Sequence, residues 1–323
     1  MNKEKMLTDA LKDGLKEHEV MRNHTTMRVG GVADYYYEAK TVDELVKAIK
    51  VANETEIPYF IVGGGSNIIF SDFGFPGLVI KNSTSNIAFM NEKSQAIVDA
   101  GVPLLSFILE ATSHNFSGLE FLYGVPGTVG GAIYGNAGAY GQAIGDFVKY
   151  VTVLMPSGEI IQQEATWMEF GYRESKIKKE DGFKKPVILS ARIQLAQNRQ
   201  EEIMRRINTY KEKRWQSQPV GLSAGCIFRN PIPKELENVT GRGSKGMPDL
   251  PKERRAGYIL DKAGAKKLKV GNAKVSGKHA NFIINDSDAK AQDIRKLIEL
   301  MRNAAKEKFD TDLKEEVEYV GQW

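Results

Sequence analysis

The chain has 323 residues, 41% of them hydrophobic, which is enough for about two or three domains with substantial cores. Its 45 basic and 41 acidic residues give a formal charge of +4, too mixed to indicate a nucleic-acid-binding protein. One cysteine excludes an intramolecular disulfide, and four histidines without clustering predict no metal site. Because the sequence has neither an apolar signal core nor an uncharged run long enough to span a membrane, we expect a cytoplasmic protein without a membrane or nucleic-acid partner.

Residues 41–67 predict a helix, a strand and a glycine turn in that order. Thr41 and Glu44 have the spacing of a capping box, and apolar residues follow on one side of the helix that this box would begin. The buried-strand pattern of 59–62 leads directly into Gly-Gly-Gly-Ser-Asn at 63–67, a turn of the size that cradles a phosphate. Taken alone, a tight surface turn explains this loop about as well.

The segment 118–141 is the most informative part of the sequence. Its eight glycines, interleaved with small residues, allow backbone amides to approach a ligand closely, and its apolar residues disfavour a flexible linker. Neither this segment nor 63–67 ends in Gly-Lys-Ser/Thr, which disfavours triphosphate hydrolysis, and neither fits the Rossmann fingerprint cleanly. The two loops therefore indicate a dinucleotide whose pyrophosphate is held by backbone amides.

The remaining sequence adds strands and helices to these two loops. Strand-like segments are expected at 97–98 and 151–154, and residues 199–215 have helical composition. The Gln-Pro pair at 218–219 ends that helix and indicates a boundary. Beyond it lie the only cysteine and a predicted helix at about 287–309, whose apolar residues recur at helical spacing.

An ordered set of motifs resembles the UDP-N-acetylenolpyruvoylglucosamine reductase (MurB) family, and the resemblance covers almost the whole chain. The motifs stand at 25–31, 63–67, 118–141, 172–175, 223–231, 275–282 and 313–317. The resemblance implies an α+β protein with an FAD-binding fold of the vanillyl-alcohol-oxidase type in two subdomains, plus a smaller α+β substrate-binding domain. The compact spacing from 141 to 172 is similar to that of the shorter, type II subgroup.

The same resemblance implies a division of the chain and a reaction. Residues 1–82 and 83–217 are expected to be the FAD-binding subdomains, 218–310 the substrate-binding domain, and 311–323 a C-terminal segment that returns to the active site. The implied reaction is the NADPH-dependent reduction of UDP-N-acetylglucosamine enolpyruvate to UDP-N-acetylmuramate through FAD, in peptidoglycan precursor synthesis. Hydride reaching the β-carbon leaves negative charge on the carboxylate and α-carbon, so the site needs a cation and a proton donor.

Three residues match the family's catalytic positions. Arg173 offers a permanently charged planar fork to a carboxylate, although a surface ion pair is its ordinary role. Cys226 stands where the family usually has a serine as proton donor, and a thiol, which titrates at about 8.5, is a competent acid. If Arg173 or a helix end lowered its pKa further, part of the thiol would ionise and could not donate. A buried structural cysteine is the alternative.

Glu316 matches the family's catalytic glutamate, and its neighbour Glu315 is the rival for that role. Alternation along a strand would put Glu316 and Glu318 on one face and Glu315 and Val317 on the other. A solvated acidic edge strand is the alternative. Glu318 stands where the family often has a basic residue, which leaves any contact made by that position in doubt.

The resemblance also implies the binding residues. Cofactor contacts are expected at Arg28, Gly63, Gly64, Gly65, Ser66, Asn67, Pro126, Gly127, Thr128, Gly130, Gly131, Ala132, Ala137 and Gly138. Substrate contacts are expected at Tyr140, Arg214 and Asn230, with Arg214 a partner for a diphosphate. Tyr140 fits a core position equally well.

The stretch 232–255 is longer than this connection usually is in the family, and we hypothesise that it borders the substrate entrance. Two other functions stay open. A different flavin oxidoreductase on the same fold would not need Arg173, Cys226 and Glu316 together, and a non-catalytic protein would bind a nucleotide without consuming NADPH. We expect a monomer.

Overall fold

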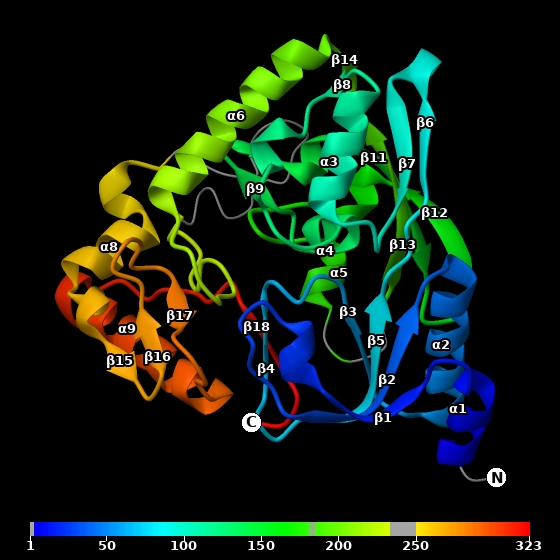
Figure 1. Cartoon of the computed structure of the whole chain (residues 1–323), viewed down its shortest axis with the longest axis horizontal. Helices are drawn as coiled ribbons and strands as arrows, with labels where there is room; N and C mark the ends of the chain where they lie inside the picture. Colours follow the sequence, from blue (N-terminus) through cyan, green and yellow to red (C-terminus); the bar gives the residue numbers. More distant parts are fainter. Residues whose placement is uncertain (1–2, 181, 183–184, 233–249) are drawn as a thin grey trace.

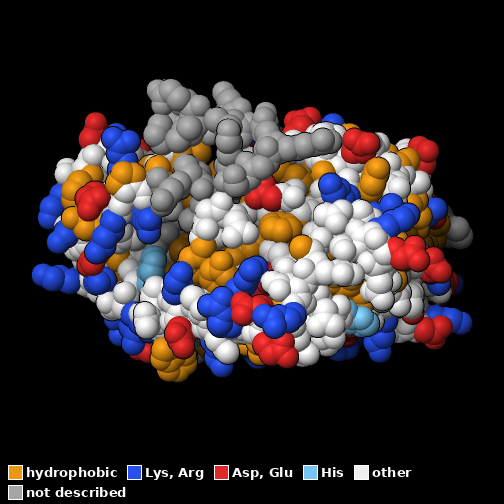
Figure 2. Space-filling view, turned by 90° about the horizontal axis from the view of Figure 1, so that it is seen from above, with side chains coloured by type: hydrophobic (Ala, Val, Ile, Leu, Met, Phe, Trp, Pro, Cys, Tyr) orange, Lys and Arg blue, Asp and Glu red, His pale blue; other side chains and the backbone are white. Residues whose placement is uncertain are grey.

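The computed structural model describes residues 3–180, 182, 185–232 and 250–323. Figure 1 shows three bodies, each with its own sheet, with the C-terminal segment (red) crossing from the third body to the first. Within the described ranges no helix is long and apolar enough to cross a membrane. On the face seen in Figure 2, basic and acidic side chains are interspersed, in keeping with the small formal charge.

The first sheet has the order β1-β2-β5-β3, with β2 and β3 parallel to β5 and β1 antiparallel to β2. Its strands are β1 (Lys16–Val20), β2 (Val32–Ala39), β3 (Tyr59–Val62) and β5 (Phe75–Asn82), with helices α1 (Lys3–Leu11) and α2 (Val42–Thr55). Leu45, Ala48 and Ile49 of α2 are buried in a core shared with the sheet. The predicted capping box is confirmed, because Thr41 accepts from the amide of Glu44 while the Glu44 carboxylate accepts from the amide of Thr41.

The second sheet is antiparallel, in the order β12-β11-β13-β7-β6. Its strands are β6 (Ile87–Met90), β7 (Gln95–Asp99), β11 (Val148–Leu154), β12 (Ile160–Glu164) and β13 (Val187–Gln194), and its helices are α3 (Leu104–Ser113), α4 (Val129–Tyr134), α5 (Lys176–Lys179) and α6 (Gln200–Ser217). The strands predicted at 97–98 and 151–154 lie within β7 and β11. The glycine-rich segment contains α4, whose buried residues join the largest core of the described chain.

The third sheet is a small antiparallel meander against two helices. It consists of β15 (Lys269–Val270), β16 (Ala273–Val275) and β17 (Ile283–Asn285), packed with α8 (Ala256–Lys262) and α9 (Ala291–Phe309). The predicted start of α9 at 287 is wrong by four residues. The Asp72 carboxylate, from the loop before β5, accepts from the amides of Ala291 (2.9 Å) and Gln292 (3.0 Å) and so caps the helix from a distant part of the chain.

Three short strand pairs of the described chain lie outside these sheets, and the last of them joins the C-terminal segment to the first body. They are β8 (Phe116–Ser117) with β14 (Ala196–Gln197), β9 (Gly138–Ala139) with β10 (Gln142–Ala143), and β4 (Ile68–Phe70) with β18 (Glu318–Val320). The last pair is parallel, and it attaches the C-terminus of the chain directly behind the glycine turn at 63–67. It is therefore the pair that matters most for the cavity described below.

The segment that contains Cys226 is fixed by the buried side chain of Asn281. Its oxygen accepts from the Phe228 amide (2.9 Å) and its nitrogen donates to the Phe228 carbonyl (2.8 Å), while the Asn281 carbonyl accepts from the Ile227 amide (2.9 Å). Both polar groups of Phe228 are therefore satisfied by one side chain.

We predict that Asn281→Ala lowers the free energy of unfolding by about 3 kcal/mol, because it leaves two buried backbone groups without partners. Urea denaturation measures the loss. The matched control is Asn303→Ala, which removes an exposed asparagine from α9 and should change stability by no more than about 0.5 kcal/mol. Equal stabilities of the two variants would contradict this role for Asn281.

Candidate active site

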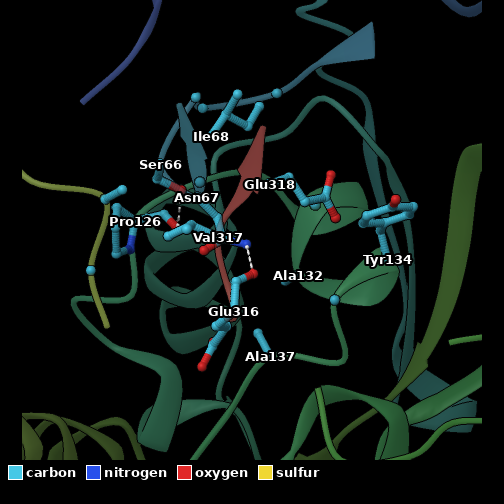
Figure 3. A pocket seen from close by; sticks show the side chains of 18 of the residues that line it. Ser66, Asn67, Ile68, Pro126, Ala132, Tyr134, Ala137, Glu316, Val317 and Glu318 are labelled. Atoms are coloured by element: carbon cyan, nitrogen blue, oxygen red, sulfur yellow. Dashed lines mark hydrogen bonds between the residues drawn. The ribbon is translucent and has the colours of Figure 1, made fainter. Parts of the chain in front are cut away.

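A large cavity opens where the three bodies meet, and residues from all of them line it. Every predicted cofactor, substrate and catalytic residue except Arg28 is among its lining residues. Arg28 lies in a smaller hollow beside it, together with Gly64 and Lys81. Figure 3 shows residues of the glycine turn, the glycine-rich segment and the C-terminal strand facing the same space. Residues far apart in sequence are thus brought to one site.

The two glycine loops pack directly against each other. A Cβ atom added to Gly64 would come within 2.6 Å of the Gly127 Cα, so the contact requires glycine. Gly65 has φ of +61°, and a Cβ atom there would overlap the His24 carbonyl oxygen. The carbonyls of Gly63 and Gly65 accept hydrogen bonds from Lys81 Nζ and the Thr26 amide, which hold the backbone of the turn in place at the cavity.

The C-terminal segment is hydrogen-bonded along both of its edges. On one edge, the Glu318 amide donates to the Asn67 carbonyl (3.0 Å), and Asn67 Nδ2 donates to the Glu316 carbonyl (3.0 Å). On the other edge, the Glu316 amide donates to the Ile227 carbonyl (2.7 Å). Glu316 is thereby placed between the glycine turn and the segment of Cys226, as Figure 3 shows for the first of these neighbours.

The acidic side chains of this segment have different ion-pair partners, although Glu315 and Val317 also line the cavity, so the prediction that only one face of the segment meets the site is wrong. Glu316 pairs with Arg173 and Glu318 with Lys178 of α5, and all four side chains line the cavity. Glu315 pairs instead with Arg302 of α9. Glu316 and Glu318 thus share one set of neighbours, and Glu315 has another.

Arg173 forms an ion pair with Glu316, with 2.9 Å between Nε and Oε1 and less than a fifth of either side chain exposed. Arg173 Nε is nevertheless buried without an aligned hydrogen-bond acceptor among the described residues. Its backbone has φ of +58°, a strained conformation for a residue with a side chain. Burial is the largest effect on Arg173 and opposes its charge, but Glu316, with smaller effects of Tyr172 and Cys226, raises the pKa on balance, so the guanidinium stays charged.

Cys226 is half-buried and lies close enough to Glu316, Arg173 and Arg214 for their charges to act on it. Burial, followed by the Glu316 carboxylate, raises the pKa of the thiol to about 12, against the opposing effect of the two arginines. The condition for a partly ionised thiol, a lowered pKa, is therefore not met in this structure. Desolvation outweighs the cations, and Cys226 keeps its proton at neutral pH.

A cluster of cations and aromatic rings lies at the mouth of the cavity. Tyr140 is 41% exposed, so the alternative of a core position is wrong, and its ring lies 4.9 Å from that of Tyr210. Lys213 Nζ lies 5.5 Å from the Tyr140 centroid and the Arg214 guanidinium carbon 5.8 Å from it. Arg214 Nε is buried without a hydrogen-bond partner among the described residues, so it is free to meet an anion.

Asn230 lines the cavity, but its side-chain oxygen is already used. That oxygen accepts from the Ala256 backbone amide at the start of α8 (3.0 Å). The backbone amide of Asn230 donates to the Tyr172 hydroxyl (3.2 Å). Tyr172 was not predicted as a site residue, although it stands directly before Arg173. Another cavity residue that the sequence did not indicate is Arg229, whose buried Nε, like that of Arg214, has no hydrogen-bond partner among the described residues.

The hypothesis about the long connection 232–255 falls mostly on residues 233–249, which lie outside the described residues. At the C-terminal end of this connection, Arg255 lines the cavity and donates through Nε to the Leu250 carbonyl (3.0 Å). In the ranges that the structure does describe, no three His, Cys, Asp or Glu side chains come together as a metal-binding group.

We predict that Cys226 is alkylated by iodoacetamide at least about 100-fold more slowly than glutathione at pH 8.5, because a thiol with a raised pKa has little thiolate. The rate should rise about tenfold per pH unit up to pH 10 without a plateau. Mass spectrometry follows the label without ambiguity, since the chain has one cysteine. A plateau near pH 8.5 would show that the thiol titrates normally and would contradict the raised pKa.

Two family models match the chain. One, described as an FAD binding domain, matches residues 33–163, and the other, described as the UDP-N-acetylenolpyruvoylglucosamine reductase C-terminal domain, matches residues 217–320. The predicted α+β FAD-binding fold is thereby confirmed, and FAD is the dinucleotide indicated by the two glycine loops.

Full-length relatives give the same result. The UDP-N-acetylenolpyruvoylglucosamine reductase of Carboxydothermus hydrogenoformans is 36% identical and covers 98% of this chain and 97% of its own. The reductase of Bacillus subtilis is 34% identical and covers 95% of this chain and 97% of its own. The crystal structure of the reductase (MurB) from Thermus caldophilus, 31% identical, superposes with a TM-score of 0.75 over 95% of this chain and 99% of that one. The chain therefore belongs to the UDP-N-acetylenolpyruvoylglucosamine reductase family.

Proposed function

We propose that this protein reduces UDP-N-acetylglucosamine enolpyruvate to UDP-N-acetylmuramate with NADPH, through bound FAD. The observation that carries the proposal is that one cavity is lined by both glycine loops and by Arg173, Cys226 and Glu316. A flavin oxidoreductase with a different substrate would not require this arginine, thiol and carboxylate together. The names of the relatives support the same substrate.

The residues of the cavity fit FAD. The turn at 63–67 presents backbone amides without a side chain in the way, which suits a pyrophosphate, and the segment 126–138 offers a bed of glycines and small residues for the ring. When bound, FAD takes up two electrons from NADPH and passes them to the substrate. The protein supplies binding, orientation and the charges around the ring.

Arg173 is the group that we assign to the enolpyruvyl carboxylate. Its Nε is held by the Glu316 carboxylate, so we assign the two terminal amino groups of the guanidinium to the substrate anion. Reduction at the β-carbon increases the negative charge on this carboxylate and on the α-carbon. A fixed cation in a desolvated site stabilises that charge without reorganising.

Cys226 is the group that we assign to protonation of the α-carbon. The thiol gives its proton to the carbon and becomes a thiolate, which water then reprotonates. Its raised pKa keeps the donor protonated in the resting enzyme, and a carbanion next to a carboxylate is far more basic than a thiolate, so the proton still moves downhill. Glu316 positions Arg173 and, through its negative charge, helps to keep the thiol neutral.

The UDP part of the substrate is assigned to the cavity mouth. Arg214 carries a buried nitrogen without a partner in the described chain, and Tyr140 offers an exposed ring beside it, which together suit a diphosphate and its neighbouring sugar. Asn230 contributes through its side-chain nitrogen Nδ2, since its side-chain oxygen accepts from the first amide of α8.

The division of labour among the parts of the chain is also a proposal. We assign FAD binding to residues 1–82 and 83–217, substrate binding to 218–310, and the return of the C-terminus to the site to 311–323. The first sheet ends at Asn82, the second spans 87–194 and the third begins at Lys269, which supports these boundaries. A monomer in the cytoplasm stays our prediction.

We predict that Cys226→Ala lowers turnover at least about 100-fold, the usual contribution of a positioned proton donor, whereas Cys226→Ser stays within about tenfold of the wild type. The assay is NADPH oxidation with the enolpyruvyl substrate. Reduction of the bound flavin by NADPH alone, which needs no proton donor, should be equal in all three proteins and serves as the control for folding. Full turnover by Cys226→Ala would remove the assignment.

We predict that Gly65→Ala weakens FAD binding at least about tenfold, because the added methyl group overlaps the His24 carbonyl and forces the turn to shift. Titration of the apoprotein with FAD measures the affinity. The matched control is Gly264→Ala, which also has positive φ (+85°) but no atom within 4 Å of the added carbon and does not line the cavity among the described residues. It should bind FAD normally, and equal losses in both variants would contradict the role of the turn.

A further inference from the structure

The cavity contains a second ion pair that the proposed reaction does not use. Lys178 of α5 lies with its Nζ 3.7 Å from Glu318 Oε1 at the start of β18, and the two side chains are only 11% and 26% exposed. Both line the same cavity as Ala132 and Ala137 of the proposed flavin bed. Figure 3 shows Glu318 projecting toward Tyr134, on the side of the strand where Ala132 also lies.

Hydrogen bonds fix Lys178 relative to that bed. Ser175 accepts from the Lys178 amide (3.3 Å) and donates to the carbonyl of Tyr134 (2.7 Å), the last residue of α4. Lys178 Nζ lies 5.9 Å from the Tyr134 ring centroid, and Lys185 Nζ donates to the Tyr134 hydroxyl (3.2 Å). The backbone of Lys178 is therefore linked to the end of α4 through Ser175, and its ammonium lies beside the Tyr134 ring within the flavin bed.

Stability alone does not account for this pair. Taking an ammonium and a carboxylate out of water costs about as much as their attraction returns, so an apolar pair of similar volume would serve the fold equally well. Burial lowers the pKa of Lys178 while Glu318 acts to raise it, which reflects the same balance. A charged pair beside a redox cofactor acts on that cofactor through its field.

We propose that Lys178 and Glu318 set the reduction potential of the bound FAD, with the ammonium favouring reduction and the carboxylate opposing it. The inference rests on the FAD site of the proposed function. A hydride delivers two electrons and one proton, so reduction by NADPH adds one negative charge to the ring. A nearby cation stabilises that added charge and a nearby anion destabilises it.

The test is the midpoint potential of the bound flavin, measured by equilibration with a reference dye without any UDP-sugar. For Lys178→Met we expect the equilibrium constant for reduction to fall about tenfold, about 30 mV for a two-electron couple, because Glu318 loses its counter-charge. For Glu318→Gln we expect a rise of similar size. Lys178→Arg keeps the charge and should stay within about threefold of the wild type.

The matched control is Lys176→Met, on the same helix. Lys176 pairs with Glu169 at 3.9 Å, outside the lining of the cavity as described, and its loss should not change the potential. If Lys178→Met does not retain FAD, the potential of Glu318→Gln tests the proposal alone: a rise supports it and a fall contradicts it. The proposal would be overturned if the midpoint potentials of Lys178→Met and Glu318→Gln shifted in the same direction. It would also be overturned if neither shifted more than the potential of Lys176→Met. A protein that bound FAD but did not reduce the UDP-sugar would contradict the proposed function and still allow these potentials to be measured.

Discussion

The constraint on which the rest of the site depends is the hydrogen bonding of the C-terminal segment along both edges. One edge joins the glycine turn through Asn67, and the other joins the segment of Cys226 through the carbonyl of Ile227. Each of these partners belongs to a different body of the fold. Because backbone hydrogen bonds fix register, the position of Glu316 is determined to within one residue, and a slip by one would turn Glu315 into its place.

This placement explains the electrostatics of the cavity. Arg173 and Lys178 each face one carboxylate from the C-terminal segment, so the cations are balanced enough to be buried. The balance is incomplete, since the Nε atoms of Arg214 and Arg229 are buried without hydrogen-bond partners in the described structure. Groups left in this condition cost stability, and a ligand that brings oxygen atoms to them recovers that cost as binding energy.

Local patterns in the sequence were enough to predict local structure. The capping box at Thr41 and the strand at 59–62 depend only on neighbouring residues, and both are present. The start of α9 was misplaced because its cap is Asp72, more than two hundred residues away. The resemblance predicted site residues that nearly all line one cavity, but it did not predict the environment of each side chain. Burial has the largest effect on the pKa of Cys226, and Lys178 meets Glu318 only because the fold brings α5 and β18 to the same cavity, which the spacing of the sequence does not predict.

The most direct test is a crystal structure of the FAD-loaded protein with UDP-N-acetylglucosamine enolpyruvate. The central claim is that the C-terminal segment assembles Arg173, Cys226 and Glu316 around the enolpyruvyl group. It predicts the carboxylate on the Arg173 guanidinium and the α-carbon within about 3.5 Å of Cys226 Sγ, on the side opposite the flavin. An enolpyruvyl group directed away from Cys226, with another acidic group nearest the α-carbon, would contradict it.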